Sequence, residues 1–140
     1  GMTSAPAFHC VFSDGDQPEM VSVREHPHVL SALNANKLDI ECIPCGGSDR
    51  FHQEREQWSS GANFFAFGPG QVMGYAHNVH TVEAMSKAGF NVVHAKNVLN
   101  GSRPIAADEK VLVTMDGSEL SRGGGGCRCM TLPLARGPLE

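Results

Sequence analysis

Short apolar runs separated by turn residues fill the first third of the chain. Phe8–Phe12 and Met20–Val23 have the apolar, β-branched character of strands. Pro27–Ala35 spaces its apolar residues along one face of a short helix, and Leu38–Pro44 alternates apolar and polar residues like a half-buried strand. The pattern therefore predicts the order β, β, α, β over residues 1–45.

The same order recurs after Gly46-Gly47, beyond a polar, partly helical stretch at Ser48–Ser60. The predicted strands at 63–67 and 71–75 are joined by a Gly-Pro-Gly turn. A helix is predicted at 78–88, which Asn78 or Thr81 can cap and which ends at Gly89, and a closing strand follows at 90–94. We therefore predict an α/β protein with two ββαβ units, over 1–45 and 46–136.

The remainder of the second part is less regular. Lys96–Glu109 is polar and is predicted to be a surface excursion, and Lys110–Met115 is predicted to be a strand. Cys127–Leu134 is predicted to be a final extended segment.

Length, charge and cysteine content limit the function classes. The 140 residues suit one ordinary domain, and a net charge of −4 without a basic stripe argues against a nucleic-acid partner. No apolar run approaches the roughly 18 residues of a membrane span, and no secretion signal is visible. Five cysteines, an odd number, suggest reduced thiols, so we expect a cytoplasmic protein.

Candidate chemistry is concentrated near the C-terminus. Four consecutive glycines, 123–126, run into Cys127-Arg128-Cys129. A thiol beside a cation and among free backbone N–H groups has the surroundings that lower a cysteine pKa, which is what a nucleophile requires. The residues by themselves leave open a glycine turn that carries two buried thiols.

Several motifs carry a family resemblance in the same order along the chain. GGGGCRCMTLPLAR resembles the C-terminal active-site loop of arginine deiminases, of the guanidine-modifying (pentein) superfamily. Upstream, the resemblance continues in five short pieces: Gly46-Gly47, EREQW at 54–58, GAN at 61–63, the GPG hairpin at 68–70 and KAG at 87–89. Together these pieces cover the chain from about Gly46 to Arg136.

The resemblance implies both a fold and a reaction. The fold would be a propeller-like ring of five ββαβ modules, of which this chain would hold about two as an incomplete ring. In the implied reaction a thiolate, Cys129, attacks the guanidinium carbon of arginine or a related guanidine, ammonia leaves, and water releases citrulline. Arg122, Gly125, Gly126 and Arg128 would shape the substrate loop, and no cofactor or metal is implied.

Three departures from the family pattern shape the functional prediction. In many members an arginine between the loop glycines meets the substrate carboxylate; Gly124 stands at that place here, so Arg122, two residues upstream, would take the role. The expected catalytic histidine is replaced by Ala7 in an ungapped match, so His9 could serve only with a two-residue slip. The modules that carry the guanidinium-binding carboxylates are not in this sequence. We therefore expect a C-terminal fragment or split-gene product of an arginine deiminase, with little or no activity alone.

Two alternatives remain. One is a non-catalytic assembly module, which would form a homo-oligomer or bind a chain carrying the missing modules. The other is a zinc site formed by four cysteines: Cys42, Cys45, Cys127 and Cys129. Glu54 and Glu56 are predicted to be salt-bridge partners rather than catalytic acids.

Overall fold

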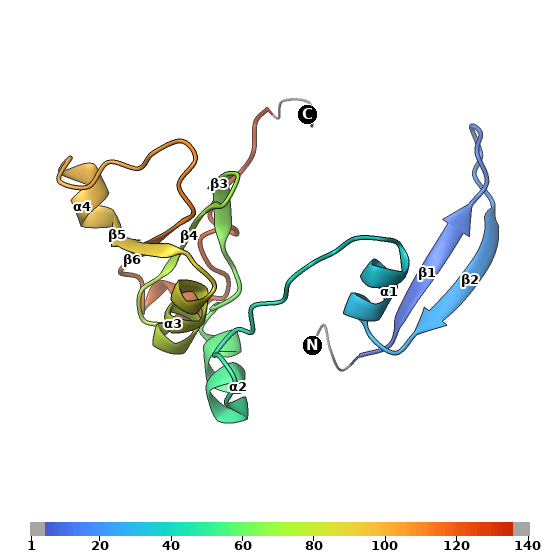
Figure 1. Cartoon of the computed structure of the whole chain (residues 1–140), viewed down its shortest axis with the longest axis horizontal. Coiled ribbons are helices and arrows are strands. Elements are labelled where there is room, and N and C mark those ends of the chain that lie inside the picture. Colours follow the sequence, from blue (N-terminus) through green and yellow to red (C-terminus); the bar gives the residue numbers. More distant parts are fainter. Residues whose placement is uncertain (1–4, 136–140) are drawn as a thin grey trace. The chain divides into compact units, whose positions relative to one another are not determined.

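The computed structural model describes residues 5–135, which fold as a mixed α/β chain, as predicted. The chain divides into two compact units, Gly1–Cys42 and Ile43–Glu140. Within the described residues the first unit has a two-stranded sheet and the second a four-stranded sheet (Figure 1).

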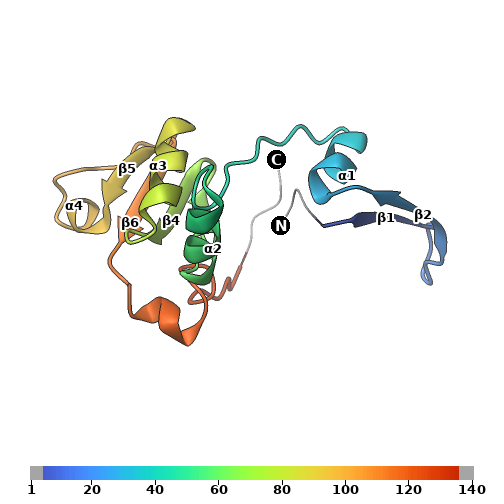
Figure 2. The same ribbon diagram turned by 90° about the horizontal axis from the view of Figure 1, so that it is seen from below.

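The first unit is a hairpin followed by a short helix. Strand β1 (Ala7–Phe12) pairs antiparallel with β2 (Met20–His26), and both follow the predicted strands closely. Helix α1 (Val29–Ala35) contacts both strands and lies beside them in both ribbon views (Figures 1 and 2). His28 caps α1, because its Nδ1 accepts a hydrogen bond from the Ser31 N–H at 3.2 Å.

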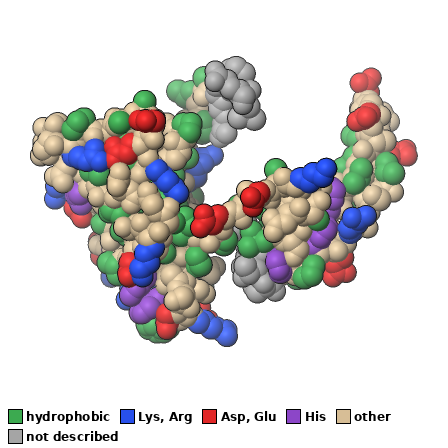
Figure 3. Space-filling model, viewed as in Figure 1, with side chains coloured by type: hydrophobic (Ala, Val, Ile, Leu, Met, Phe, Trp, Pro, Cys, Tyr) green, Lys and Arg blue, Asp and Glu red, His purple; other side chains and the backbone are tan. Residues whose placement is uncertain are grey.

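The hairpin leaves most of its apolar side chains uncovered. Figure 3 shows hydrophobic side chains on the face of the hairpin turned to the viewer. Exposed large apolar residues occur on both strands: Phe8, Val11, Phe12, Met20, Val21 and Val23. A two-stranded hairpin with one short helix has too little surface to bury both faces of its strands.

The predicted strand at Leu38–Pro44 is wrong. The described chain has no strand there, and Leu38 and Ile40 are exposed. The alternating pattern was suitable for a strand, but a strand also needs a neighbouring edge with free N–H and C=O groups. The structure provides no such neighbour for this segment, which connects the two units.

The second unit begins with a helix and a hairpin. Helix α2 (Arg50–Trp58) lies in the stretch predicted to be partly helical, and Asp49 caps it by accepting hydrogen bonds from two backbone N–H groups. Strands β3 (Phe65–Gly68) and β4 (Gln71–Tyr75) pair antiparallel around the predicted glycine turn.

The rest of the second unit completes a mixed sheet. It consists of α3 (Val79–Lys87), β5 (Asn91–His94), α4 (Ala95–Leu99), β6 (Val111–Met115) and the 3₁₀ helix η1 (Leu120–Gly123). Helix α4 was not predicted, because five residues are too few to show a helical period. The strand order is β3-β4-β6-β5, and β6 is parallel to both of its neighbours.

Strand β6 lies at the centre of the hydrophobic core. Val111, Leu112 and Val113 are buried, as expected for a central strand covered on both faces. The buried core cluster consists of Val93, Val111 and Val113. Four partly buried apolar residues from β4 and from the connection between β5 and β6 pack against it: Met73, Ala95, Val98 and Ile105.

A buried carboxylate joins the two longer helices. Glu56 of α2 is only 1% exposed and accepts hydrogen bonds from the His80 N–H at 3.0 Å and the Thr81 N–H at 2.8 Å, with a third from the Thr81 hydroxyl at 2.6 Å. Asn78 stands at the N-cap position of α3, as predicted, but its side chain makes no capping hydrogen bond. The Asn78 side chain donates to the Ser59 carbonyl at 3.1 Å instead, and Glu56 satisfies the first turn of α3.

The described helices are too short to span a membrane. Helices α2 and α3 have nine residues each, and none of the described helices combines the length and the hydrophobicity that crossing a membrane requires.

Candidate functional site

The segment after the four glycines is a tight turn. The Gly126 carbonyl accepts hydrogen bonds from the Cys129 N–H at 3.0 Å and the Met130 N–H at 3.3 Å. The Arg128 carbonyl accepts from the Thr131 N–H at 3.2 Å and the Thr131 hydroxyl at 2.8 Å. The predicted extended segment is therefore wrong over Cys127–Met130, where the backbone closes i+3 and i+4 hydrogen bonds.

The turn places its two thiols in different surroundings. Residues two apart in a helical turn point to nearly opposite sides. Cys127 is 3% exposed and its Sγ lies 3.6 Å from the Met115 sulfur, whereas Cys129 is exposed. The possibility that both thiols are buried is thus excluded.

Asn63 holds the turn from the strand side. Its Oδ1 accepts a hydrogen bond from the Arg128 N–H at 3.1 Å, and its Nδ2 donates to the Cys129 Sγ at 2.9 Å. Asn63 lies just before β3 and is half-buried. Asn63 is the last residue of the GAN motif, and no local sequence pattern assigned it a role.

Two glycines of the run allow this close approach. A Cβ at Gly126 would lie 2.7 Å from the Asn63 Cβ, closer than real Cβ contacts. Gly125 has a φ of +87°, and a Cβ there would lie 2.8 Å from the Cys129 Cβ. A Cβ at Gly123 or Gly124 would meet nothing within 4 Å, so close packing requires glycine only at Gly125 and Gly126.

The electrostatic surroundings separate the two thiols further. A backbone hydrogen bond at Gly126, the amide of Asn63 and the positive charge of Arg128 together lower the pKa of the Cys129 thiol. Burial raises the pKa of the Cys127 thiol. Cys129 is therefore the more readily ionised of the two.

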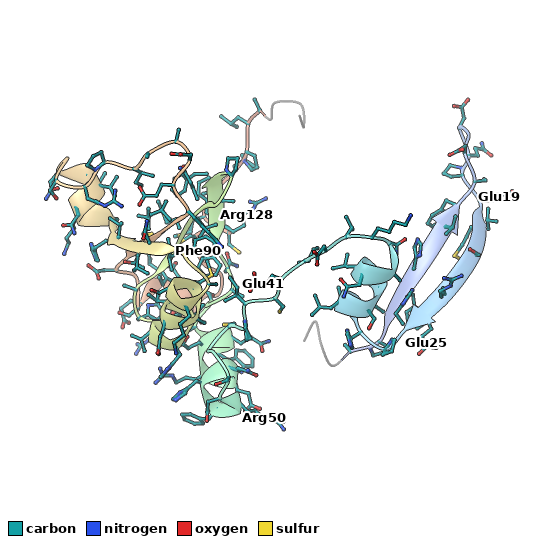
Figure 4. All side chains as sticks on the ribbon, viewed as in Figure 1. Glu19, Glu25, Glu41, Arg50, Phe90 and Arg128 are labelled. Carbon is teal, nitrogen blue, oxygen red and sulfur yellow. The ribbon has the colours of Figure 1, made fainter. Side chains whose placement is uncertain are left out.

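The predicted arginines lie on the surface on different elements. Arg122 is in η1 and forms an ion pair with Glu119 at 3.1 Å. Arg128 lies beside β3 (Figure 4) and lines an open groove of about 650 Å³. The groove is mostly apolar, and its lining comes from Phe64–Phe67, Arg128, Thr131–Pro133 and Ala135.

The candidate general acid and base, His9, belongs to the first unit. It lies in β1, where it pairs with Arg24 of β2, and its Nδ1 is 3.3 Å from the Asn36 side-chain nitrogen. The structure brings Gly125, Gly126, Arg128 and Cys129 together in the second unit.

The glutamates of the EREQW motif have structural contacts. Glu54 pairs with Arg50 at 3.0 Å on the surface, and Glu56 is 3.6 Å from Arg55 in addition to its contacts with α3. Both residues are salt-bridge partners, as predicted.

The four-cysteine zinc site has no counterpart among residues 5–135. No group of three or more His, Cys, Asp or Glu side chains is placed there to hold a metal ion. Cys45 instead lies beside Thr81, with its Sγ 3.4 Å from the Thr81 hydroxyl oxygen.

Comparison with known proteins identifies the family. The sequence model of the family described as arginine deiminase matches residues 6–136. The chain is 38% identical over 102 residues to an arginine deiminase of Mycoplasma capricolum, which covers 73% of the chain and 20% of the relative. It is 39% identical over 122 residues to one of Listeria monocytogenes, which covers 87% of the chain and 25% of the relative.

This chain belongs to the arginine deiminase family, as its motifs predicted. It spans about a fifth of the length of several curated relatives that it matches, including one from Listeria innocua at 39% identity over 102 residues, 73% of the chain and 20% of the relative.

Proposed function

We propose that this chain is the nucleophile-bearing, C-terminal part of an arginine deiminase. The supporting observation is an exposed thiol of lowered pKa, Cys129, held on a glycine turn in a chain of this family. Such a thiol has the accessibility and ionisation that nucleophilic catalysis requires. In the full pentein ring, the second unit would serve as one ββαβ module and the hairpin and helix of the first unit as part of another.

The reaction follows from the thiolate. Cys129 attacks the guanidinium carbon of arginine, the C–N bond to the terminal nitrogen breaks, and that nitrogen leaves as ammonia after it is protonated. Water then attacks the thiouronium carbon, the C–S bond breaks, and citrulline and the thiolate are released. His9 is the proposed proton donor and acceptor, and the enzyme would act in cytoplasmic arginine breakdown.

The substrate loop is the second element of the proposal. Gly125 and Gly126 let the backbone approach the sulfur, Arg128 adds positive charge beside it, and Arg122 is proposed to meet the substrate carboxylate. The carboxylates that neutralise the guanidinium would come from the missing modules. Without them the isolated chain should be slower by orders of magnitude, because several kcal/mol of transition-state stabilisation is lost.

The test is citrulline formation from arginine, measured for the purified chain and for a chimera. In the chimera, this chain replaces the matching C-terminal part of a full-length relative. We expect almost no citrulline from the chain alone and robust turnover by the chimera, abolished by Cys129→Ser and largely retained in Cys127→Ser. A folded chimera without turnover, or turnover unaffected by Cys129→Ser, contradicts the proposal.

A second candidate function is assembly with other modules. Trp58 is 88% exposed, Leu134 is 92% exposed, and the strands of the first unit carry exposed apolar side chains. Exposed apolar surface of this kind is typical of a protein that is covered by a partner. We propose that the chain forms a homo-oligomer or binds a chain carrying the missing modules. Light scattering that finds a stable monomer alone and with an upstream fragment of a relative contradicts this candidate.

A further inference from the structure

Asn63 contacts the turn that carries Cys129, and this contact joins two segments that are far apart in sequence. Asn63 precedes the edge strand β3, and Cys129 lies 66 residues after Asn63 in the sequence. One side chain makes both hydrogen bonds, to the Arg128 N–H at 3.1 Å and to the Cys129 sulfur at 2.9 Å. The backbone and the sulfur are therefore positioned by the same amide group.

The first hydrogen bond determines the orientation of the amide. A backbone N–H can only donate, so the Asn63 Oδ1 must face Arg128. The NH₂ group of Asn63 is then turned to the sulfur. An amide NH₂ donates without accepting, and its hydrogen bond is stronger to a charged acceptor than to a neutral one. This contact therefore favours the ionised form of the sulfur.

The packing beside this contact is an independent observation. Gly126 lies against Asn63 so closely that a built Cβ would be 2.7 Å from the Asn63 Cβ and 3.1 Å from its Cγ. A side chain at position 126 would push the amide away from the sulfur. The glycine thus serves the hydrogen bonds of Asn63 as well as the shape of the turn.

We propose that Asn63 is a positioning residue that orients the Cys129 sulfur toward substrate and stabilises it as the thiolate. This inference rests on the proposed function, in which Cys129 is the nucleophile. It adds a residue outside the glycine loop, whose two polar atoms have separate tasks: Oδ1 holds the turn and Nδ2 stabilises the charge.

Two substitutions separate these tasks. Asn63→Asp is nearly isosteric and keeps an oxygen for the Arg128 N–H, but it replaces the donor to sulfur with a negative oxygen. Asn63→Ala removes both hydrogen bonds. If Asn63 had a purely structural role, Cys129 would be as reactive in the Asp variant as in the original chain. If Asn63 stabilises the thiolate, Cys129 is less reactive in the Asp variant than in the Ala variant.

The readout is the rate at which iodoacetamide alkylates Cys129 as a function of pH, measured by mass spectrometry. Trypsin cleaves after Arg128, so Cys127 and Cys129 fall in separate peptides. We expect the alkylation midpoint of the Asn63→Ala variant to move to higher pH, with about three- to tenfold slower reaction at pH 7, and that of Asn63→Asp to move further. An Asp variant with the midpoint of the original chain overturns the proposal.

An unmutated chain offers a second measurement, in case the variants fold poorly. The NMR signals of the Asn63 side-chain NH₂ should shift with pH along with Cys129 ionisation, and this shift should vanish in Cys129→Ser. Signals that do not respond to ionisation of Cys129 contradict the proposal. Neither measurement uses arginine, so a chain that produces no citrulline can still confirm the role of Asn63.

Discussion

Removal of the Glu56 carboxylate tests the link between α2 and α3. In Glu56→Ala, two backbone N–H groups of α3 and the Thr81 hydroxyl lose their acceptor. A hydrogen bond to a charged group contributes about 1.5–3 kcal/mol, and water can replace part of this at the half-buried His80. We therefore expect the free energy of unfolding of the second unit to fall by about 3–5 kcal/mol, a large part of the stability of a small domain.

Glu54→Ala is the matched control on the same helix. Glu54 also loses an ion pair, with Arg50, but the side chains of this pair are 63% and 91% exposed. Exposed pairs of this kind contribute about 0–1 kcal/mol. Urea unfolding followed by circular dichroism, with amide exchange of the first turn of α3, measures both variants. Equal losses in Glu56→Ala and Glu54→Ala would refute the reasoning.

The pH dependence of stability gives a second test of the same contact. Burial acts to raise the pKa of Glu56, but hydrogen bonds from the Thr81 hydroxyl and from the His80 and Thr81 backbones outweigh it and lower that pKa below its ordinary value. Ionised Glu56 therefore stabilises the fold above the ordinary value, near 4.3, and this contribution is lost as the pH falls through the lowered pKa. We expect Tm to drop between about pH 5 and pH 3 in the original chain and less in Glu56→Gln.

Two further predictions concern the cysteine turn. Gly126→Ala should displace Asn63 and slow the alkylation of Cys129 severalfold at pH 7. Gly123→Ala is the control and should leave the rate unchanged, because a Cβ there meets nothing within 4 Å. Equal alkylation rates in the two variants count against the packing argument. In the folded chain, Cys129 should be alkylated at least about tenfold faster than Cys127, because only Cys129 is exposed and has a lowered pKa. This difference in rate should disappear in urea. Similar rates before unfolding would show that the turn does not bury Cys127.

Local patterns in the sequence were enough to predict most of the secondary structure. The apolar strand at 71–75, the helix that follows it and the glycine that ends that helix all depend on neighbours a few residues away. Gly89 has a φ of +88°, the conformation expected of the residue after a helix. The family was also within reach of the sequence, because the glycine run, the EREQW motif and the cysteine pair occur in family order.

Tertiary structure alone decided the remaining features, because they depend on partners distant in sequence. Leu38–Pro44 has a strand-like pattern but no strand beside it, and β6 enters the sheet between two strands that precede it. The burial of Cys127, the exposure of Cys129 and the amide that faces its sulfur depend on a turn packed against residue 63. A linear pattern encodes which side chains are available, whereas the folded backbone determines which of them come within hydrogen-bond distance.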